Sequence, residues 1–113
     1  MKITTILKPW GSFIEFIKNE PCTVKLIYVN KGEELSLQYH NHRAEFWHVI
    51  SGHPFLTIGE KKIKAKPGDE FKIQIKELHR LEAQDDTVQI LEIAYGDFDE
   101  EDIVRVEDKY GRN

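Results

Sequence analysis

The stretch GEELSLQYHNHRAEFWHVISG, residues 32–52, holds three histidines within an alternating pattern of polar and apolar residues. Side chains of a strand alternate between its two faces, so a strand over 35–41 puts Gln38 and His40 on one face, about 6 to 7 Å apart. Glu45 follows a short turn at 41–44 and opens the next strand, 45–50. Gly32 and Gly52 bound the stretch as turn residues. It therefore predicts β-structure with polar groups gathered on one face.

The rest of the chain supports an all-β fold. Apolar residues alternate over 12–18, 23–29, 35–39 and 70–75, and denser apolar runs occupy 46–50 and 88–95. Gly, Pro, Asn and Asp clusters separate these segments, as expected for an antiparallel sandwich or barrel. We expect one domain over residues 1–113. The acidic run 97–102 is either a short helical turn or irregular cover over the fold, or a solvated tail.

Composition excludes several classes of protein. The 113 residues carry 16 Lys and Arg against 20 Asp and Glu, a net charge of −4, which argues against general nucleic-acid binding. Cys22 is the one cysteine, so no intramolecular disulfide is possible and a reducing, cytoplasmic location is the default. We find no signal peptide and no membrane-spanning apolar run. A phosphorylated small molecule remains possible as a ligand, because a local Arg cluster can bind phosphate.

A fourth candidate group, His79, lies 34 residues after Glu45. Imidazole and carboxylate groups bind zinc, manganese and iron. If His79 lies on a strand beside the first two, three strands contribute Gln38, His40, Glu45 and His79 to one point inside a barrel. The alternative is a metal-free barrel, in which Gln38 is a buried hydrogen-bonding residue.

Residues 32–52 resemble the first motif of the cupin family: Gly, five residues, His-x-His, four residues, Glu, six residues, Gly. The register fits Gly32, His40, Glu45 and Gly52, with Gln38 in place of the first His. Pairing His40 with His42 instead breaks the spacing. Residues 68–79 resemble the second motif, but Gln74 and Lys76 replace its Pro and Gly. The resemblance implies a double-stranded β-helix, or jelly-roll barrel, that holds one divalent ion (Zn, Mn, Fe, Co or Ni) with Gln38, His40, Glu45 and His79.

A narrower resemblance covers nearly the whole chain. Residues 35–47, 8–13, 79–82 and 102–112 resemble segments of type II mannose-6-phosphate isomerases, which also occur as C-terminal domains of bifunctional guanylyltransferase/isomerase proteins. The resemblance implies conversion of mannose 6-phosphate to fructose 6-phosphate through a cis-enediol. His42 is the first candidate for proton transfer and Glu45 the second, with Arg43 as a further catalytic candidate. The candidate contacts to the sugar phosphate are Trp10, Arg43, Arg80, Arg105 and Arg112, and each arginine has a surface ion pair as its alternative.

Two rival hypotheses stay open. One is a non-catalytic cupin that binds a metal, a sugar or a small acid, which the altered loop before His79 favours. The other is a cupin enzyme of another reaction class, such as a dioxygenase or another sugar isomerase or epimerase. By analogy with cupins of this size, we also expect a homodimer that pairs through apolar strands.

Overall fold

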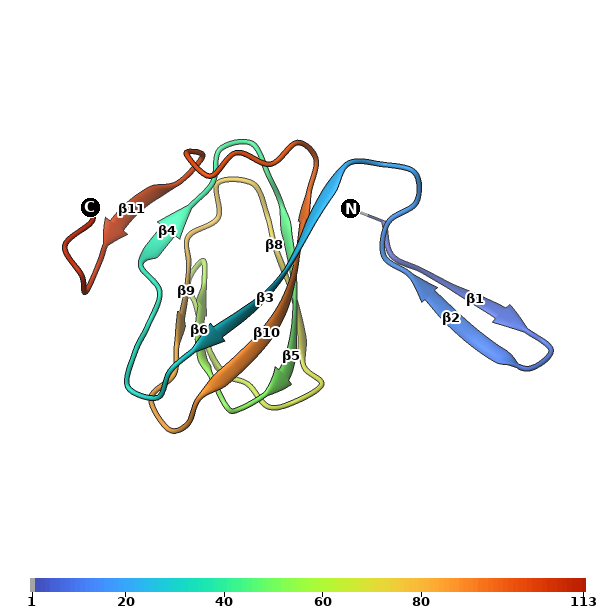
Figure 1. Cartoon of the computed structure of the whole chain (residues 1–113), viewed down its shortest axis with the longest axis horizontal. Helices are drawn as coiled ribbons and strands as arrows, with labels where there is room; N and C mark the ends of the chain where they lie inside the picture. The colour runs from blue at the N-terminus through green and yellow to red at the C-terminus, as the bar shows by residue number, and fades with distance from the viewer. Residues whose placement is uncertain (1) are drawn as a thin grey trace.

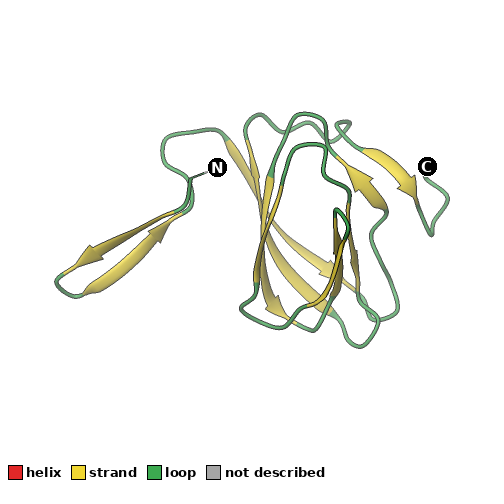
Figure 2. Cartoon of the chain, turned by 180° about the vertical axis from the view of Figure 1, so that it is seen from behind, coloured by secondary structure: helices red, strands yellow, loops and turns green. Residues whose placement is uncertain are grey.

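The computed structural model describes residues 2–113, which form strands and no helix (Figures 1 and 2). Over that range no helix exists that could span a membrane. The strands, in chain order, are β1 (Thr4–Lys8), β2 (Gly11–Glu15), β3 (Cys22–Val29), β4 (Leu37–Tyr39), β5 (Glu45–Ser51), β6 (Phe55–Ile58), β7 (Lys61–Lys64), β8 (Glu70–Ile73), β9 (His79–Glu82), β10 (Val88–Tyr95) and β11 (Val104–Glu107).

Two antiparallel sheets face each other and enclose the core, which confirms the predicted all-β architecture. One sheet has the order β3-β10-β5-β8 and the other β11-β4-β9-β6-β7. Within the described range, β1 and β2 pair only with each other. Strands that are distant in sequence are neighbours: β3 lies beside β10 and β4 beside β9. This interleaving brings residues near 40, 45 and 79 to one end of the barrel (Figure 1).

The core lies between the two sheets and follows the alternation of the strands. Along β10, Val88 and Ile90 point inward and are fully buried. They meet Trp47 of β5 and Leu81 of β9, which belong to the same buried cluster. Each such apolar side chain contributes about 1.5–3 kcal/mol when it leaves water. The packed half of the barrel is therefore a rigid support for the polar end.

Two segments differ from the sequence expectation, and the acidic run settles between its expected alternatives. The predicted strand 12–18 is β2, which ends at Glu15 and pairs with an unforeseen β1 in a hairpin that projects from the barrel (Figure 1). The predicted strand 35–39 is shortened to β4. The acidic run takes one of the forms expected for it, an irregular cover with a turn, and is followed by β11.

Candidate metal centre

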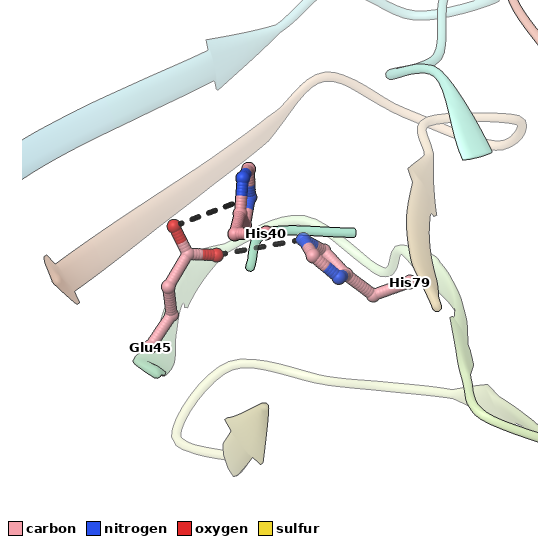
Figure 3. A group of neighbouring side chains, drawn as sticks. All are labelled: His40, Glu45 and His79. Atoms are coloured by element: carbon pink, nitrogen blue, oxygen red, sulfur yellow. Dashed lines mark ion pairs between the residues drawn. The ribbon is translucent and has the colours of Figure 1, made fainter. Parts of the chain in front are cut away.

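Three of the predicted ligands converge in the interior of the barrel. His40, Glu45 and His79 are all buried, and each offers a ligand atom within 4.8 Å of the others. One carboxylate oxygen of Glu45 lies 3.7 Å from His40 Nε2, and the other lies 3.5 Å from His79 Nε2. Figure 3 shows both rings on one side of the Glu45 carboxylate, with each carboxylate oxygen directed at one ring. The convergence predicted from spacing is thus present for these three residues.

Strand order explains the convergence. His40 follows the last residue of β4, Glu45 is the first residue of β5, and His79 is the first residue of β9. Gln38 and His79 are directly opposite each other in the β4–β9 pair. Directly opposed residues share a face of a sheet, so Gln38 belongs to the same inner face as His79. Three strands therefore supply the cluster, as the sequence predicts.

Backbone carbonyls orient both imidazoles. The Nδ1–H of His40 donates to the Asp102 carbonyl at 2.6 Å, and that of His79 donates to the Glu77 carbonyl at 2.9 Å. Each ring then directs the lone pair of Nε2 toward the centre of the cluster, an arrangement typical of metal-ligating histidines. Among residues 2–113, His79 Nε2 and Glu45 Oε1 are buried and find no hydrogen-bond partner. These donor atoms fit a divalent ion, which would complete both.

Gln38 remains a predicted ligand. Its side chain is partly buried, and Oε1 accepts a hydrogen bond from Ser36 Oγ at 2.5 Å. An amide oxygen has a second lone pair, so this bond leaves a coordination position available. Placement on the face of His79 is consistent with the predicted fourth ligand.

Arg43 lies against the cluster instead of projecting into solvent. Its Nε donates to Glu45 Oε2 at 3.1 Å, Nη1 donates to the Asp99 carbonyl, and Nη2 lies 3.4 Å from His40 Nε2. The guanidinium also stacks on the ring of Phe98 at 4.3 Å. The catalytic and phosphate roles predicted for Arg43 remain predictions. In the structure, Arg43 contacts two candidate ligands, Glu45 and His40, and the Asp99 carbonyl of the segment that covers the site.

The ionisation of Glu45 follows from its neighbours. Burial alone would raise the pKa of its carboxyl, but the neighbouring side chains of His79, Glu92 and His40 hold that pKa well below its ordinary value. For His40, burial lowers the pKa, and Glu45 opposes that effect only in part. The favoured state is a carboxylate beside a neutral imidazole, which is the protonation that metal binding requires.

Glu92 is a buried acid that the sequence reading missed. It lies on β10, is 6% exposed, and accepts a hydrogen bond from Trp47 Nε1 at 3.1 Å. Burial, and then the charge of Glu45, raise the pKa of its carboxyl. The alternation of inward and outward residues along β10 could have revealed it, because Glu92 follows Val88 and Ile90 in the series of inward-facing positions. A charged residue at an inward position of an apolar strand indicates a polar site.

The remaining predicted site residues divide into two groups. Arg105 lies opposite Gln38 in the β11–β4 pair, on the inner face, and its Nε is buried without a hydrogen-bond partner. His42 is exposed on the loop after β4, and its backbone N–H donates to Asp102. His42 is two residues from His40 and Arg105 is opposite Gln38, and the roles predicted for both remain predictions.

Trp10, Arg80 and Arg112 are not brought to the cluster. Trp10 is 73% exposed in the turn of the β1–β2 hairpin. The side chain of Arg80 lies on the opposite face of β9 from His79, among Glu34 and Glu107. Arg112 pairs with Asp108 at 2.7 Å. Their positions give no support to the predicted substrate contacts, and the two arginines adopt the ion-paired alternative.

The loop before His79 keeps the geometry of the cupin motif without its glycine. Lys76, at the position of the motif's Gly, has a φ of 65°. Its backbone N–H donates to the His40 carbonyl at 2.8 Å. The replacement of Pro and Gly therefore leaves the turn intact and still delivers His79 to the cluster.

Comparison with known proteins agrees with this geometry. A family profile described as mannose-6-phosphate isomerase C-terminal matches residues 1–108. The chain belongs to this family. XanB, a xanthan biosynthesis protein of Xanthomonas campestris, is 37% identical over 109 residues, which are 95% of this chain and 23% of XanB. AlgA, an alginate biosynthesis protein of Pseudomonas aeruginosa, is 38% identical over 109 residues, with the same coverage of 95% and 23%.

A third relative, the mannose-1-phosphate guanylyltransferase ManC of Salmonella typhimurium, is 37% identical over 110 residues, 95% of this chain and 23% of ManC. This cupin domain therefore spans about a quarter of the length of these relatives.

Solved structures confirm the cupin fold. A cupin protein of Bacteroides fragilis superposes with a TM-score of 0.61 at 23% identity, covering 66% of this chain and 65% of that one. The Bacillus subtilis oxalate decarboxylase, a protein with Mn(II) centres, superposes with a TM-score of 0.68 at 22% identity, covering 77% of this chain and 24% of its own. At this level of identity the likeness concerns the fold alone.

Proposed function

We propose that this cupin isomerises mannose 6-phosphate to fructose 6-phosphate with one divalent ion held by Gln38, His40, Glu45 and His79. The observation that carries the proposal is the buried cluster, in which His79 Nε2 and Glu45 Oε1 lack hydrogen-bond partners. Membership in the mannose-6-phosphate isomerase C-terminal family supplies the substrate class. The bound ion would act as a Lewis acid on the sugar oxygens.

The protein's own groups have separate tasks. The reaction moves a proton from C2 to C1 of the sugar, so a base must lie near both carbons. Glu45 belongs to the proposed ligand set, which leaves exposed His42, on the ligand loop, as the proposed proton carrier. Arg43 orients the Glu45 carboxylate through its 3.1 Å hydrogen bond to Oε2.

The phosphate group requires a cation at the border of the cluster. Arg105 meets this requirement, because it shares the inner face with Gln38 and its Nε is unpaired and buried. Guanidinium groups bind phosphate through two parallel hydrogen bonds, and lysine cannot reproduce that geometry. We therefore assign the phosphate contact to Arg105.

The test is a coupled assay that measures fructose 6-phosphate formed from mannose 6-phosphate by protein loaded with zinc, manganese, cobalt, iron or nickel. The proposal expects turnover with at least one metal, and loss of that turnover in the variant His79→Ala. Absence of turnover with every metal overturns the isomerase assignment.

A second candidate function is a cupin that binds a metal or sugar phosphate without turnover. The observation in its favour is closure: His40, Glu45 and His79 are at most 2% exposed, and carbonyls of the segment 97–103 contact His40 and Arg43. A substrate can reach side chains this buried only if part of the surrounding structure moves. A sugar phosphate that raises the melting temperature while no product forms favours this second function.

A further inference from the structure

The candidate metal cluster is closed to solvent, but one segment beside it is held only by polar contacts. The segment 97–102 crosses this end of the barrel between β10 and β11 (Figure 1). Its carbonyls at Asp99 and Asp102 accept hydrogen bonds from Arg43 and His40. Every residue of the segment is exposed or half-buried. A segment with so little buried apolar surface can open locally while the barrel stays folded.

The charge of this segment favours its release. Five of the six residues 97–102 are acidic, in a chain whose net charge is already −4. Like charges this close in sequence repel one another. Lys25 of β3 is a cation that holds them, with Nζ 2.9 Å from a carboxylate oxygen of Glu100. The Glu100 side chain is 77% exposed, and ion pairs at such exposed positions stabilise only weakly.

Phe98, the one apolar residue of the segment, contacts two cations. The centre of its ring lies 4.1 Å from Lys25 Nζ and 4.3 Å from Arg43 Cζ. Lys25 is directly opposite Glu92 in the β3–β10 pair, so both belong to the inner face. Arg43 donates to the candidate ligand Glu45. The Phe98 ring therefore connects the segment both to β3 and to the cluster.

Both ends of the segment are fixed to the fold. At the start, Gly96 has a φ of 89°, which glycine adopts without strain, and its N–H donates to the Pro21 carbonyl at 3.0 Å. At the other end, the Asp102 carboxylate accepts hydrogen bonds from two backbone N–H groups of the ligand loop. Movement about such ends is confined to residues 97–101, as in loops that close over binding sites.

We propose that residues 97–101 are a lid over the cluster and that Phe98 is its latch, released from Lys25 and Arg43 when the lid opens. Release of Phe98 also withdraws the Asp99 carbonyl from Arg43 and uncovers the ligands behind that side chain. The three clustered ligands are at most 2% exposed, so any ion or sugar phosphate needs such an opening. The ligands admitted rest on the proposed function, whereas the opening belongs to the metal-free chain.

Chemical labelling of the metal-free chain measures the opening. Diethylpyrocarbonate acylates neutral imidazoles that solvent reaches, and mass spectrometry gives the rate at each histidine. In the wild type, buried His40 should react slowly and exposed His53 quickly. Phe98→Leu removes both cation–π contacts, so the His40 rate should rise about tenfold while that of His53 stays unchanged. Phe55→Leu is the matched control, because Lys64 Nζ lies 5.0 Å from that ring at the end of β6 farther from the cluster.

Glu100→Gln tests the ion pair separately. The substitution is at an exposed position, so it spares the core, and it should raise the His40 rate about two- to fivefold. It also keeps the test decisive if urea denaturation shows that Phe98→Leu is unstable. High salt should raise the wild-type rate more than the rate of Glu100→Gln. A His40 rate that is unchanged in both lid variants, or that rises equally in Phe55→Leu, overturns the lid.

Metal exchange tests what the lid admits. A latch affects rates rather than equilibria, so Phe98→Leu should speed ion uptake and ion release to a chelator by the same factor and leave the affinity unchanged. Stopped-flow mixing measures both rates. A lower affinity with an unchanged uptake rate would show that Phe98 supports a ligand instead, and it would overturn the gating role. A chain that binds no ion removes the proposed function, while the labelling result still decides the lid.

Discussion

Buried atoms without partners are the most informative feature at the scale of single residues. His79 Nε2 and Glu45 Oε1 have neither solvent nor a hydrogen bond. Leaving a buried polar group unsatisfied costs about 1–3 kcal/mol, and such groups are rare in folded proteins. Two of them facing each other at 3.5 Å therefore indicate a site that a cation completes.

Arg105 offers a prediction at this scale. Arg105→Lys keeps the charge but removes the forked geometry, so the KM for mannose 6-phosphate should rise about tenfold or more. The coupled assay on metal-loaded protein measures this change. Arg112→Lys is the control, because Arg112 is already paired with Asp108 at the surface. Equal KM values for the Arg105 variant and wild type would remove the phosphate assignment.

The ligand positions could be predicted from sequence because they depend on spacing within short strands. Gln38 and His40 are two residues apart, and Glu45 follows one turn later. Glu92 could not be assigned in the same way. Its burial depends on a partner, Trp47 Nε1, which lies 45 residues away. Alternation along β10 marks the position of Glu92 as inward, but the partner of its carboxylate leaves no local pattern in the sequence.

Backbone conformation gives a prediction at the scale of elements. Lys76 has a φ of 65°, a conformation that costs about 1–2 kcal/mol for a residue with a side chain, while glycine loses about 0.5–1 kcal/mol in chain entropy. Lys76→Gly should therefore raise the free energy of unfolding by about 0.5 kcal/mol. Urea denaturation measures this difference, and a clear loss of stability would show that the Lys76 side chain makes a contribution of its own.

Gly52 provides the opposite case. Its φ is 84°, and a Cβ there would lie within 2.4 Å of the Thr87 carbonyl oxygen. Gly52→Ala should lower the free energy of unfolding by about 2–4 kcal/mol, because the strain and the backbone clash add. The same urea experiment tests both substitutions.

The segment between β10 and β11 connects the cover of the site to the ligand loop. The Asp102 carboxylate accepts hydrogen bonds from the backbone N–H groups of Asn41 and His42, at 2.8 and 3.0 Å. Asp102→Ala removes these bonds and loosens the carbonyl that orients His40. Metal affinity should fall about 10–100-fold, as for other residues that support ligands. Titration calorimetry measures the affinity, and an unchanged value would show that the loop holds its shape alone.

Strand positions were predictable where apolar alternation was strong, as for β3 and β10. The sequence did not predict β1, because polar and apolar residues alternate only weakly in its Thr-rich segment. Its partner strand, β2, follows a turn at Pro9 and Trp10. The strand predicted over 35–39 begins at residue 37. The backbone N–H of Leu35 donates to the Leu81 carbonyl, but this hydrogen bond lies outside the regular β4–β9 pairing. The existence of β1 and the start of β4 thus depend on pairing between strands rather than on local strand propensity.

At the scale of the whole molecule, the C-terminus is tied back to the barrel. The Tyr110 hydroxyl donates to Glu33 at 2.5 Å, and Lys109 pairs with the same carboxylate. These two contacts, that from Tyr110 first, lower the pKa of Glu33. The associated stability is therefore present above the unfolded pKa of about 4.3 and is lost as the pH falls through the lower, folded value.

Tyr110→Phe tests this tie. The variant should be less stable than wild type at neutral pH, and the difference should shrink when the pH is lowered to about 3. Urea denaturation at the two pH values makes the comparison. A difference that is independent of pH would assign the effect to packing of the ring instead of the bond to Glu33.

The metal content of the purified chain is the most direct test of the central claim. Elemental analysis should find one divalent ion per chain in the wild type and almost none in His79→Ala, with Arg112→Lys retaining the wild-type content. A folded wild type that binds no divalent ion when each metal is supplied would contradict the account.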